Sequence, residues 1–194
     1  MTDNRPKKLI ANYFKPSIYI RSFKDVNLTQ LKRQGIRLFI SDLDNTLVPH
    51  YTRLPNADVI NFIQKIQSAG ITFVIVSNNT KNRTQRFAEK TSADAFYGNA
   101  RKPFKRVVRS IIERYQVLPS ETIIMGDQIV MDILVANRLK CESILVQPLV
   151  STDYKMNWFH MFLERVIYSR LAKRNILVKG QFTSSDLSDR LELL

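Results

Sequence analysis

Short apolar segments that favour β-structure alternate with segments of helical periodicity between residues 37 and 146. This alternation is typical of a parallel sheet that carries helices on both faces. We therefore expect an α/β fold of three layers, α/β/α, with a mostly parallel central sheet. The strands are predicted at Arg37 to Ser41, Thr72 to Ser77, Ala95 to Tyr97, Thr122 to Gly126 and Ser143 to Gln147.

Three helices are predicted from the spacing of apolar residues between these strands. The apolar residues from 59 to 66 recur at helical spacing and stop before Gly70, a residue that favours helix C-termini. A second helix is expected after Pro103, since proline suits a first helical turn, and a third from Met131 to Arg138.

Length and composition indicate one domain with short extensions. A chain of 194 residues with 44% hydrophobic content can bury a substantial core. No apolar run is long enough to span a membrane and the first twenty residues lack a signal-type apolar core, so we expect a cytoplasmic protein, with peripheral attachment to the inner membrane face. The single cysteine, Cys141, has no disulfide partner and is expected to pack in the core.

The formal net charge of +13 is densest in residues 1–36, which we interpret as a basic N-terminal extension packing on the core. Residues 37–150 form the predicted core, and residues 151–194 a C-terminal amphipathic helix and tail rich in aromatic and basic residues. Such a charge attracts polyanions, which include an anionic membrane surface, phosphorylated substrates and nucleic acid. Charge alone does not choose among them.

Polar residues follow the predicted strands at the points where each strand ends. Asp42 and Asp44 come after the first strand, Ser77 after the second and Asp127 after the strand at residue 122, while Lys102 precedes a helix. Ligands of open α/β sheets bind at the carboxyl ends of the strands, so these groups should converge. Two close carboxylates repel each other unless a cation lies between them, and Mg²⁺ is the natural candidate. The pattern predicts a phosphoryl-transfer site.

Four short segments, taken in chain order, resemble the four motifs of the haloacid dehalogenase-like (HAD) superfamily of phosphohydrolases. They are Asp42-x-Asp44-x-Thr46, Ser77, Lys102, and Gly126-Asp127 with Asp132. The residues found in all four motifs are similar to those of the YqeG-type branch of subclass IIIA. That branch is in turn similar to mitochondrial phosphatidylglycerophosphate phosphatases. The resemblance implies a HAD-like Rossmannoid phosphatase core.

The resemblance also implies a role for each carboxylate. Asp42 would be the nucleophile that forms an aspartyl-phosphate, and Asp44 the general acid for the leaving group and then the base for water. Mg²⁺ would be held by the Asp42 carboxylate, the Asp44 backbone carbonyl and Asp127. Thr46 and Asp132 would support these groups. In the functional alternative, Asp132 would tether Lys102 or a metal-bound water. In the structural alternative, it is a carboxylate in the first turn of a helix, where the helix dipole favours negative charge.

Ser77 and Lys102 would hold the phosphoryl oxygens, and N–H groups at a helix N-terminus near Asn78 would add donors. Taken alone, Ser77 could equally be a helix N-cap and Lys102 a solvated lysine. Lys102 and the basic residues at 105, 106 and 109 recur at helical spacing, which predicts a cationic helix face.

The spacing of the motifs leaves no room for a sizeable cap domain. About ten residues separate Leu47 from the first predicted helix, and 25 positions separate Ser77 from Lys102. An open site suits a phosphate presented by a protein, a nucleic acid end or a lipid at a membrane surface. The aromatic and basic helix expected from residue 157 to residue 171 suits a membrane interface, or its apolar side packs on the sheet.

Three functions are compatible with these features. The first is a Mg²⁺-dependent phosphatase that converts phosphatidylglycerophosphate to phosphatidylglycerol at the membrane surface, with an anionic phospholipid as substrate. The second is a phosphatase for soluble metabolites or phosphoproteins. The third is a nucleic-acid- or ribosome-associated binding protein on the same fold, with salt-dependent RNA binding that survives mutation of Asp42.

Overall fold

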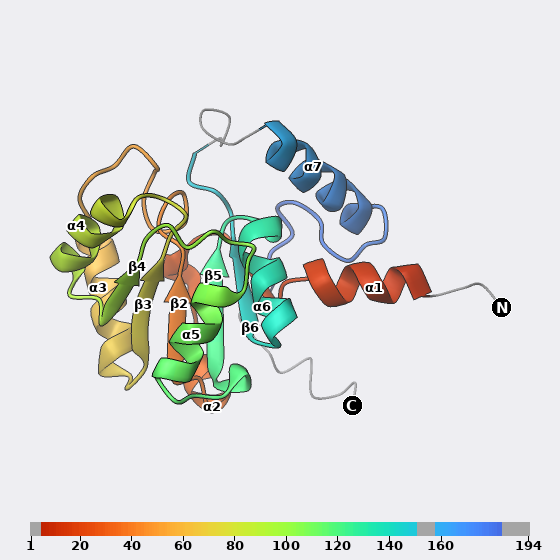
Figure 1. Cartoon of the computed structure of the whole chain (residues 1–194). Coiled ribbons are helices and arrows are strands. Elements are labelled where there is room, and N and C mark those ends of the chain that lie inside the picture. Colours follow the sequence, from red (N-terminus) through yellow and green to blue (C-terminus); the bar gives the residue numbers. More distant parts are fainter. Residues whose placement is uncertain (1–4, 151–157, 184–194) are drawn as a thin grey trace.

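The computed structural model describes residues 5–150 and 158–183, which form one six-stranded sheet with helices on both faces (Figure 1). Every strand pair is parallel, and the order across the sheet is β1-β6-β5-β2-β3-β4. The predicted α/β fold with a parallel central sheet is confirmed. The strands are β1 (Ile18–Ile20), β2 (Leu38–Ser41), β3 (Thr72–Val76), β4 (Ala95–Tyr97), β5 (Thr122–Gly126) and β6 (Glu142–Val146).

The helices form two layers. One face of the sheet carries α2 (Leu28–Arg33), α3 (Ala57–Ser68) and α4 (Lys81–Thr91). The other face carries α5 (Arg106–Arg114) and α6 (Leu134–Leu139), and α1 (Arg5–Phe14) and α7 (Trp158–Ala172) lie beside α6. A π-helical turn, Ile129–Ile133, leads into α6, and 3₁₀ turns occur at Phe23–Asp25 and Pro119–Glu121.

Both faces of the sheet are buried, which explains why its strands are apolar without alternation. In β3, Phe73 and Ile75 belong to the core under α3 and α4, whereas Val74 belongs to the core under α5. Phe39 and Phe73 stack across neighbouring strands with ring centroids 5.3 Å apart, and the edge of Phe62 from α3 packs on Phe39 at 5.8 Å. These aromatic contacts fix β2 and β3 side by side, and the candidate site follows their ends.

Three local features differ from what the sequence led us to expect. The strand β1 was not predicted; it pairs with β6 at the edge of the sheet and so places part of the basic extension within the sheet. The helix expected from Pro103 begins only at Arg106, so Lys102 does not lie on its cationic face as predicted. The helix expected from Met131 starts instead as the π-helical turn at Ile129. Between Leu47 and Lys102 the chain adds only α3, β3, α4 and β4, with no inserted cap domain.

The C-terminal helix α7 has two different halves. Ile167 and Leu171 in its second half are buried against β1, β6 and the π-helical turn, so the packing alternative is confirmed there. Trp158, Phe159 and Phe162 in its first half are 72%, 52% and 58% exposed. Among the described helices, none is long and apolar enough to cross a membrane.

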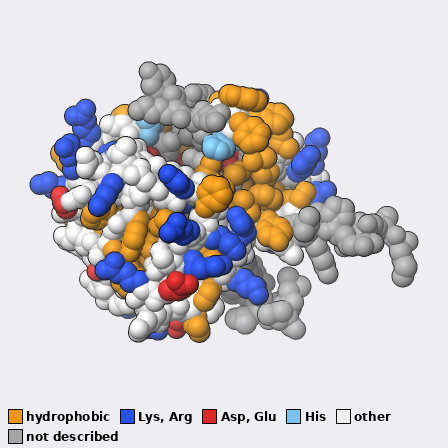
Figure 2. Space-filling view, in the orientation of Figure 1, with side chains coloured by type: hydrophobic (Ala, Val, Ile, Leu, Met, Phe, Trp, Pro, Cys, Tyr) orange, Lys and Arg blue, Asp and Glu red, His pale blue; other side chains and the backbone are white. Residues whose placement is uncertain are grey.

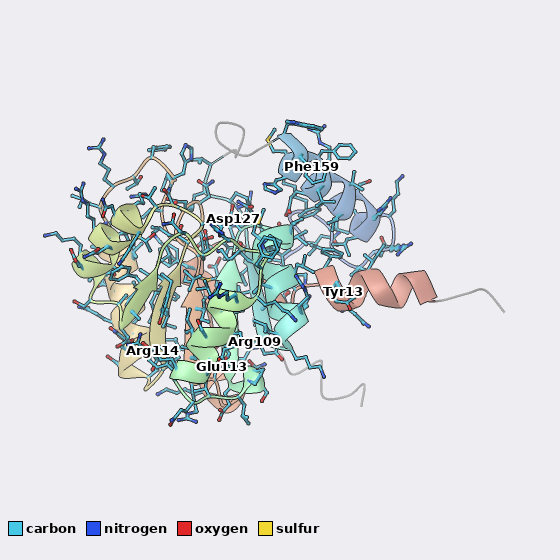
Figure 3. All side chains as sticks on the ribbon, viewed as in Figure 1. Tyr13, Arg109, Glu113, Arg114, Asp127 and Phe159 are labelled. Carbon is cyan, nitrogen blue, oxygen red and sulfur yellow. The ribbon has the colours of Figure 1, made fainter. Side chains whose placement is uncertain are left out.

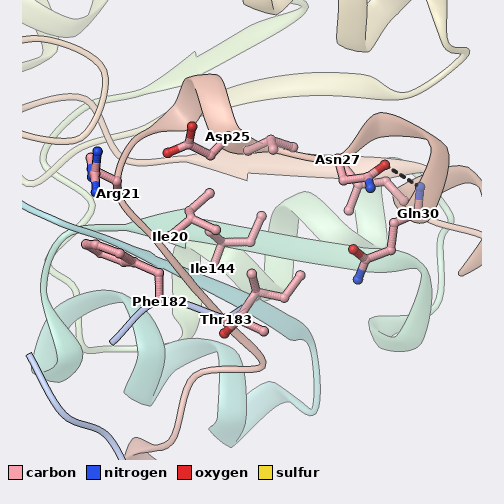
Figure 4. A pocket seen from close by; sticks show the side chains of 11 residues that line it. Ile20, Arg21, Asp25, Asn27, Gln30, Ile144, Phe182 and Thr183 are labelled. Atoms are coloured by element: carbon pink, nitrogen blue, oxygen red, sulfur yellow. Dashed lines mark hydrogen bonds between the residues drawn. The ribbon is translucent and has the colours of Figure 1, made fainter. Parts of the chain in front are cut away.

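Two further features belong to the scaffold. Cys141 is buried in the core between the sheet and α6, and burial raises the pKa of its thiol to about 12, which fits the predicted packing role. A hollow of about 390 Å³ lies beside β1, where Ile20, Ile144 and Phe182 line it (Figure 4). This hollow shares no lining residue with the site described below.

Candidate active site

Asp42 leaves the sheet directly after β2, because its N–H still bonds to the carbonyl of Met125 in β5 at 2.8 Å. The chain then makes a tight turn in which Asn45 has a left-handed φ of 64°, a conformation that asparagine tolerates. The turn brings Thr46 back beneath Asp42, and its hydroxyl lies 3.4 Å from Asp42 Oδ2 and 3.2 Å from Asp127 Oδ1. The side chains of Asp42 and Asp127 are therefore neighbours.

Lys102 lies between two buried carboxylates. Its Nζ donates to Asp42 Oδ1 at 2.7 Å and to Asp132 Oδ1 at 2.6 Å, and the lysine is only 6% exposed. Asn78 fixes the backbone of this lysine, since its side-chain amide accepts from Lys102 N at 2.7 Å and donates to Lys102 O at 3.0 Å. Lys102 is therefore held at both its backbone and its ammonium group, and the solvated-lysine alternative does not apply.

The segment after β5 brings Asp132 to Lys102. Asp132 Oδ2 accepts from the N–H of Gln128 at 3.2 Å, and a Cβ on Gly126 would lie 2.1 Å from Asp132 Cγ. Only glycine fits at residue 126 while Asp132 stays in this place. The tether between Asp132 and Lys102 implied by the resemblance is present in the structure.

Asp44 is held by the side chain of Arg83, which was not predicted for the site, and by that of Asn79, which follows Ser77 and Asn78 after β3. Arg83 Nη2 donates to Asp44 Oδ1 at 2.8 Å, and Asn79 Nδ2 donates to Asp44 Oδ2 at 2.9 Å. Arg83 lies in the first turn of α4, three residues after the N-cap Thr80. The sequence feature that could have indicated Arg83 is a basic residue in the first turn of a helix that follows a strand.

Glu164 of α7 was also missed. Its two carboxyl oxygens accept from the N–H groups of Ile129 at 2.6 Å and Val130 at 3.0 Å, at the start of the π-helical turn. This turn follows Asp127 and carries Asp132. Because 34 and 35 residues separate the partners, no local sequence pattern marks the contact.

The electrostatics of the site are dominated by burial. Burial raises the pKa of Asp42 to about 6, against the opposing effect of Lys102, and it raises that of Asp127 well above its ordinary value, with further repulsion from Asp42 and Asp132. Burial alone would lower the pKa of Lys102, but together the charges of Asp132 and Asp42 raise it above the usual value. The lysine is therefore a permanent cation beside the nucleophile candidate.

The donor set fits a divalent cation such as Mg²⁺. Among the described residues, four carboxylates, those of Asp42, Asp44, Asp127 and Asp132, gather here, and the ion pairs they make involve two basic groups, Lys102 and Arg83. Asp127 Oδ2 is buried without a hydrogen-bond partner, which is costly unless a cation binds it. Among the described residues, no three acidic, histidine or cysteine side chains are grouped so as to hold a metal ion. The ligand set implied by the resemblance has two side chains, those of Asp42 and Asp127, together with the Asp44 backbone carbonyl.

A cavity of about 220 Å³ opens over these groups. The cavity is lined by six of the predicted site residues, which are Asp42, Asp44, Ser77, Asn78, Lys102 and Asp132. Its other lining residues are Asn45, His50, Asn79, Gln128 and Met131. Asp127 and Thr46 lie behind it and are absent from its wall. The cavity is small, and its lining residues other than Met131 carry polar side chains, which suits a phosphoryl group.

The helix N-terminus that was expected to supply N–H donors near Asn78 lies further along the chain. Helix α4 begins at Lys81 with Thr80 as its N-cap, so Ser77 is not the N-cap either. Ser77 Oγ accepts from the N–H of Asn79 at 3.0 Å and lies at the cavity wall. The side chain of Asn78 positions Lys102 and is engaged there. A phosphate would therefore meet the Ser77 hydroxyl and Lys102.

Two comparisons at the sequence level agree with this geometry. The family model of haloacid dehalogenase-like hydrolases matches residues 9–146. "Probable phosphatase YqeG" from Bacillus subtilis (strain 168) is 30% identical over 168 residues, which are 86% of this chain and 96% of that protein.

Solved structures of similar fold include two with TM-scores of 0.51. One is an uncharacterized protein from Listeria monocytogenes serotype 4b, 18% identical, with 62% of this chain and 85% of that chain covered. The other is a HAD family enzyme from Bacteroides thetaiotaomicron, an aspartate-to-alanine mutant in complex with magnesium and inorganic phosphate, 10% identical, with 62% of this chain and 98% of that chain covered. At these identities the likeness concerns the fold.

Proposed function

Because the chain belongs to the haloacid dehalogenase-like hydrolase family and carries a phosphatase-type site, we propose that it is a Mg²⁺-dependent phosphomonoesterase acting on phosphatidylglycerophosphate at a membrane surface. The observation that carries the chemistry is the pairing of buried Asp42 with Lys102 beside the unpartnered oxygen of Asp127. In this arrangement Asp42 would be the nucleophile and Lys102 the phosphate-binding cation at the cavity wall, and the Asp127 oxygen behind the wall would be the metal ligand.

The proposed reaction has two steps. In the first, one oxygen of Asp42 attacks phosphorus in line, the bond from phosphorus to the leaving oxygen breaks, and Asp44 gives its proton to that oxygen. In the second, Asp44 takes a proton from water, the water oxygen attacks phosphorus, and the aspartyl-phosphate bond breaks to release inorganic phosphate. Asp42 and Asp44 are then back in their starting states.

The remaining residues bind and orient the phosphoryl group. Lys102 and the Ser77 hydroxyl would meet its equatorial oxygens, where negative charge is concentrated in the transition state. Asp132 and Asn78 hold Lys102 in place for this contact. Mg²⁺, bound by Asp42, Asp127 and the Asp44 carbonyl, would offset repulsion between the nucleophile and the anionic phosphate.

The lipid substrate is supported by the surroundings of the site. Residues 5–150 and 158–183 add no cap domain over the cavity, which supports access for a phosphate on a large or surface-bound molecule. Figure 2 shows hydrophobic side chains gathered over α7, with Lys and Arg side chains around them, and Figure 3 shows Phe159 of α7 above Asp127. An exposed aromatic patch with basic neighbours suits an anionic lipid surface.

The deciding experiment measures phosphate release from phosphatidylglycerophosphate in mixed micelles with Mg²⁺, beside a panel of soluble phosphomonoesters. We expect strong release from the lipid that is lost without Mg²⁺ and in Asp42→Asn. A preference for a soluble ester would replace the lipid substrate with a soluble one and retain the chemistry. Absence of Asp42-dependent release from any substrate would favour the nucleic-acid-binding alternative.

A further inference from the structure

A groove of about 640 Å³ runs between α7 and the ends of β5 and β6. Its apolar wall and floor consist of Trp158, Met161, Phe162, Leu145, Val146 and Pro148. Its volume lies within the range of sites that bind small molecules. Trp158 and Phe162 are large apolar side chains that remain mostly exposed here, which is unfavourable unless something covers them.

The groove is continuous with the candidate active site. Gln128 lines both the groove and the 220 Å³ cavity, and Asp127, a proposed Mg²⁺ ligand, lines the groove. Glu164, which bonds to the turn after Gln128, also lies in the groove wall. A molecule with its phosphate at Asp42 can therefore extend past Gln128 into the groove without leaving the surface of the protein.

The two ends of this continuous site differ in chemistry. The residues that line the cavity carry polar side chains, apart from Met131, and suit a phosphomonoester, whereas the groove has a continuous wall of apolar side chains that suits a hydrocarbon chain. Arg165 and Lys179 line the groove together with the acidic Asp127 and Glu164, so the groove itself carries no net charge and the preference for an anion comes from Lys102 at the cavity. Resting on the proposed function, we propose that this groove binds one acyl chain of the phosphomonoester lipid whose phosphate is hydrolysed at Asp42.

Helix α7 offers a matched pair of phenylalanines to test this. Phe162 lines the groove and Phe159 does not, although both lie in the same half of the helix and are similarly exposed. Insertion of α7 into a bilayer would use both rings, because both are exposed beside Trp158. A chain bound in the groove would use Phe162 alone. The two modes therefore make different predictions for the two variants.

The first measurement uses the only tryptophan of the chain, Trp158, as a probe of the groove. Full-length Asp42→Asn protein is titrated with a lysophosphatidate below its micelle concentration, and with glycerol 3-phosphate, which has the same head group and no chain. We expect a saturable blue shift of the emission with the lysophosphatidate alone. The same shift with glycerol 3-phosphate, or no shift with either, would overturn the proposal.

The second measurement compares kcat/KM for lysophosphatidate with kcat/KM for glycerol 3-phosphate. Phe162→Ala should lower this ratio by about tenfold, since each methylene removed from contact weakens binding by roughly fourfold. Phe159→Ala should leave it unchanged. Because Phe162 could also affect folding, Ser169→Phe provides a second test: it fills the groove from an exposed position and should lower the ratio, whereas Arg170→Phe, outside the groove, should not.

The outcomes separate this proposal from the proposed function. Equal effects of Phe162→Ala and Phe159→Ala on the ratio would show that the acyl chain does not depend on the groove and would overturn the groove, while the Asp42-dependent phosphatase would stand. A chain-dependent shift of Trp158 emission that Phe162→Ala abolishes would support the groove even if no lipid were hydrolysed. In that case the proposed reaction would fail.

Discussion

At the scale of single residues, the site is organised by one buried ammonium shared between two buried carboxylates. Lys102 bonds to Asp42 and Asp132 at nearly equal distances, so each carboxylate limits how strongly the lysine neutralises the other. A buried ion pair of this kind contributes little net stability, but loss of one partner is costly because it leaves a charge unpaired. The arrangement positions Lys102 for the phosphate more than it stabilises the fold.

Asp132→Asn tests this positioning role. The variant removes the second anion beside Lys102 without changing the volume, so Lys102 should pair more tightly with Asp42 and be less available to the phosphate. We expect kcat/KM to fall by about ten- to a hundredfold. The measurement is steady-state phosphate release, with far-UV circular dichroism and thermal unfolding as controls for folding. Activity within twofold of the unsubstituted protein would contradict the role of Asp132.

Arg83 makes a second prediction at this scale. Its bond to Asp44 Oδ1 orients the proposed general acid, and the acid matters only where the leaving group needs a proton. Arg83→Gln should therefore lower kcat by about tenfold on an alkyl phosphate and much less on p-nitrophenyl phosphate, whose leaving group departs without protonation. Asp44→Asn should show the same selectivity, more strongly. Equal losses on both substrates would mean that Arg83 binds substrate or supports the fold instead.

At the scale of elements, α7 is tied to the active site by Glu164. Burial raises the pKa of this carboxyl to about 7 and the charge of Asp132 adds to the shift, while the N–H groups of Ile129 and Val130 oppose it. Its pKa in the folded state is thus above that in the unfolded chain. The folded state binds the proton more tightly, so the free energy of unfolding should fall as pH rises from about 4.5 to about 7.

Glu164→Gln isolates this contribution. The glutamine does not titrate, so the difference in unfolding free energy between the two proteins should change by roughly 1 to 3 kcal/mol across this pH range. Urea unfolding of both proteins at several pH values gives the difference directly. A difference that stays constant from pH 4.5 to pH 7.5 would show that Glu164 has an ordinary pKa in the folded protein.

The elements also show what the sequence could predict. The five predicted strands and the helix before Gly70 are present because their signals are local: continuous apolar runs, helical spacing and a stop residue. The strand β1 was missed because it lies outside the alternating region between residues 37 and 146, and its partner is β6 at the far end of the core. The π-helical turn was missed because its i to i+5 bonds have no sequence signature.

The candidate site divides in the same way. The convergence of Asp42, Asp44, Ser77, Lys102 and Asp127 could be predicted, since each follows a strand or precedes a helix of a parallel sheet and such ends meet at one edge. Asp132 was expected at the site only from the resemblance. Arg83 and Glu164 could not be predicted, because their partners are 39 and 34 or more residues away and the contacts depend on how helices pack. Asn78 was expected to donate to phosphate, and only the structure shows its amide on the backbone of Lys102.

At the scale of the whole molecule, the charge of +13 predicts binding to anionic surfaces. Arg106 and Arg109 are exposed on α5, and Phe104 just before it is 69% exposed, which gives a basic and aromatic face on the helix that follows Lys102. Lys65 and Lys90 are equally exposed on α3 and α4, which cover the opposite face of the sheet. The pair Arg106 and Arg109 and the pair Lys65 and Lys90 therefore allow the same change of net charge to be made on either face of the sheet.

The double variant Arg106→Glu/Arg109→Glu should weaken binding to vesicles that contain anionic phospholipid by about tenfold or more, since each basic residue near such a surface contributes ~1 kcal/mol. Lys65→Glu/Lys90→Glu has the same net charge and should bind almost as the unsubstituted protein does. Vesicle co-sedimentation at low and high salt measures both, and the difference should shrink as salt screens the charges. Equal losses in the two variants would mean that total charge, and not this face, governs the association.

Tight, salt-dependent RNA binding that is insensitive to both lipid and Asp42→Asn would instead assign the charge to nucleic acid.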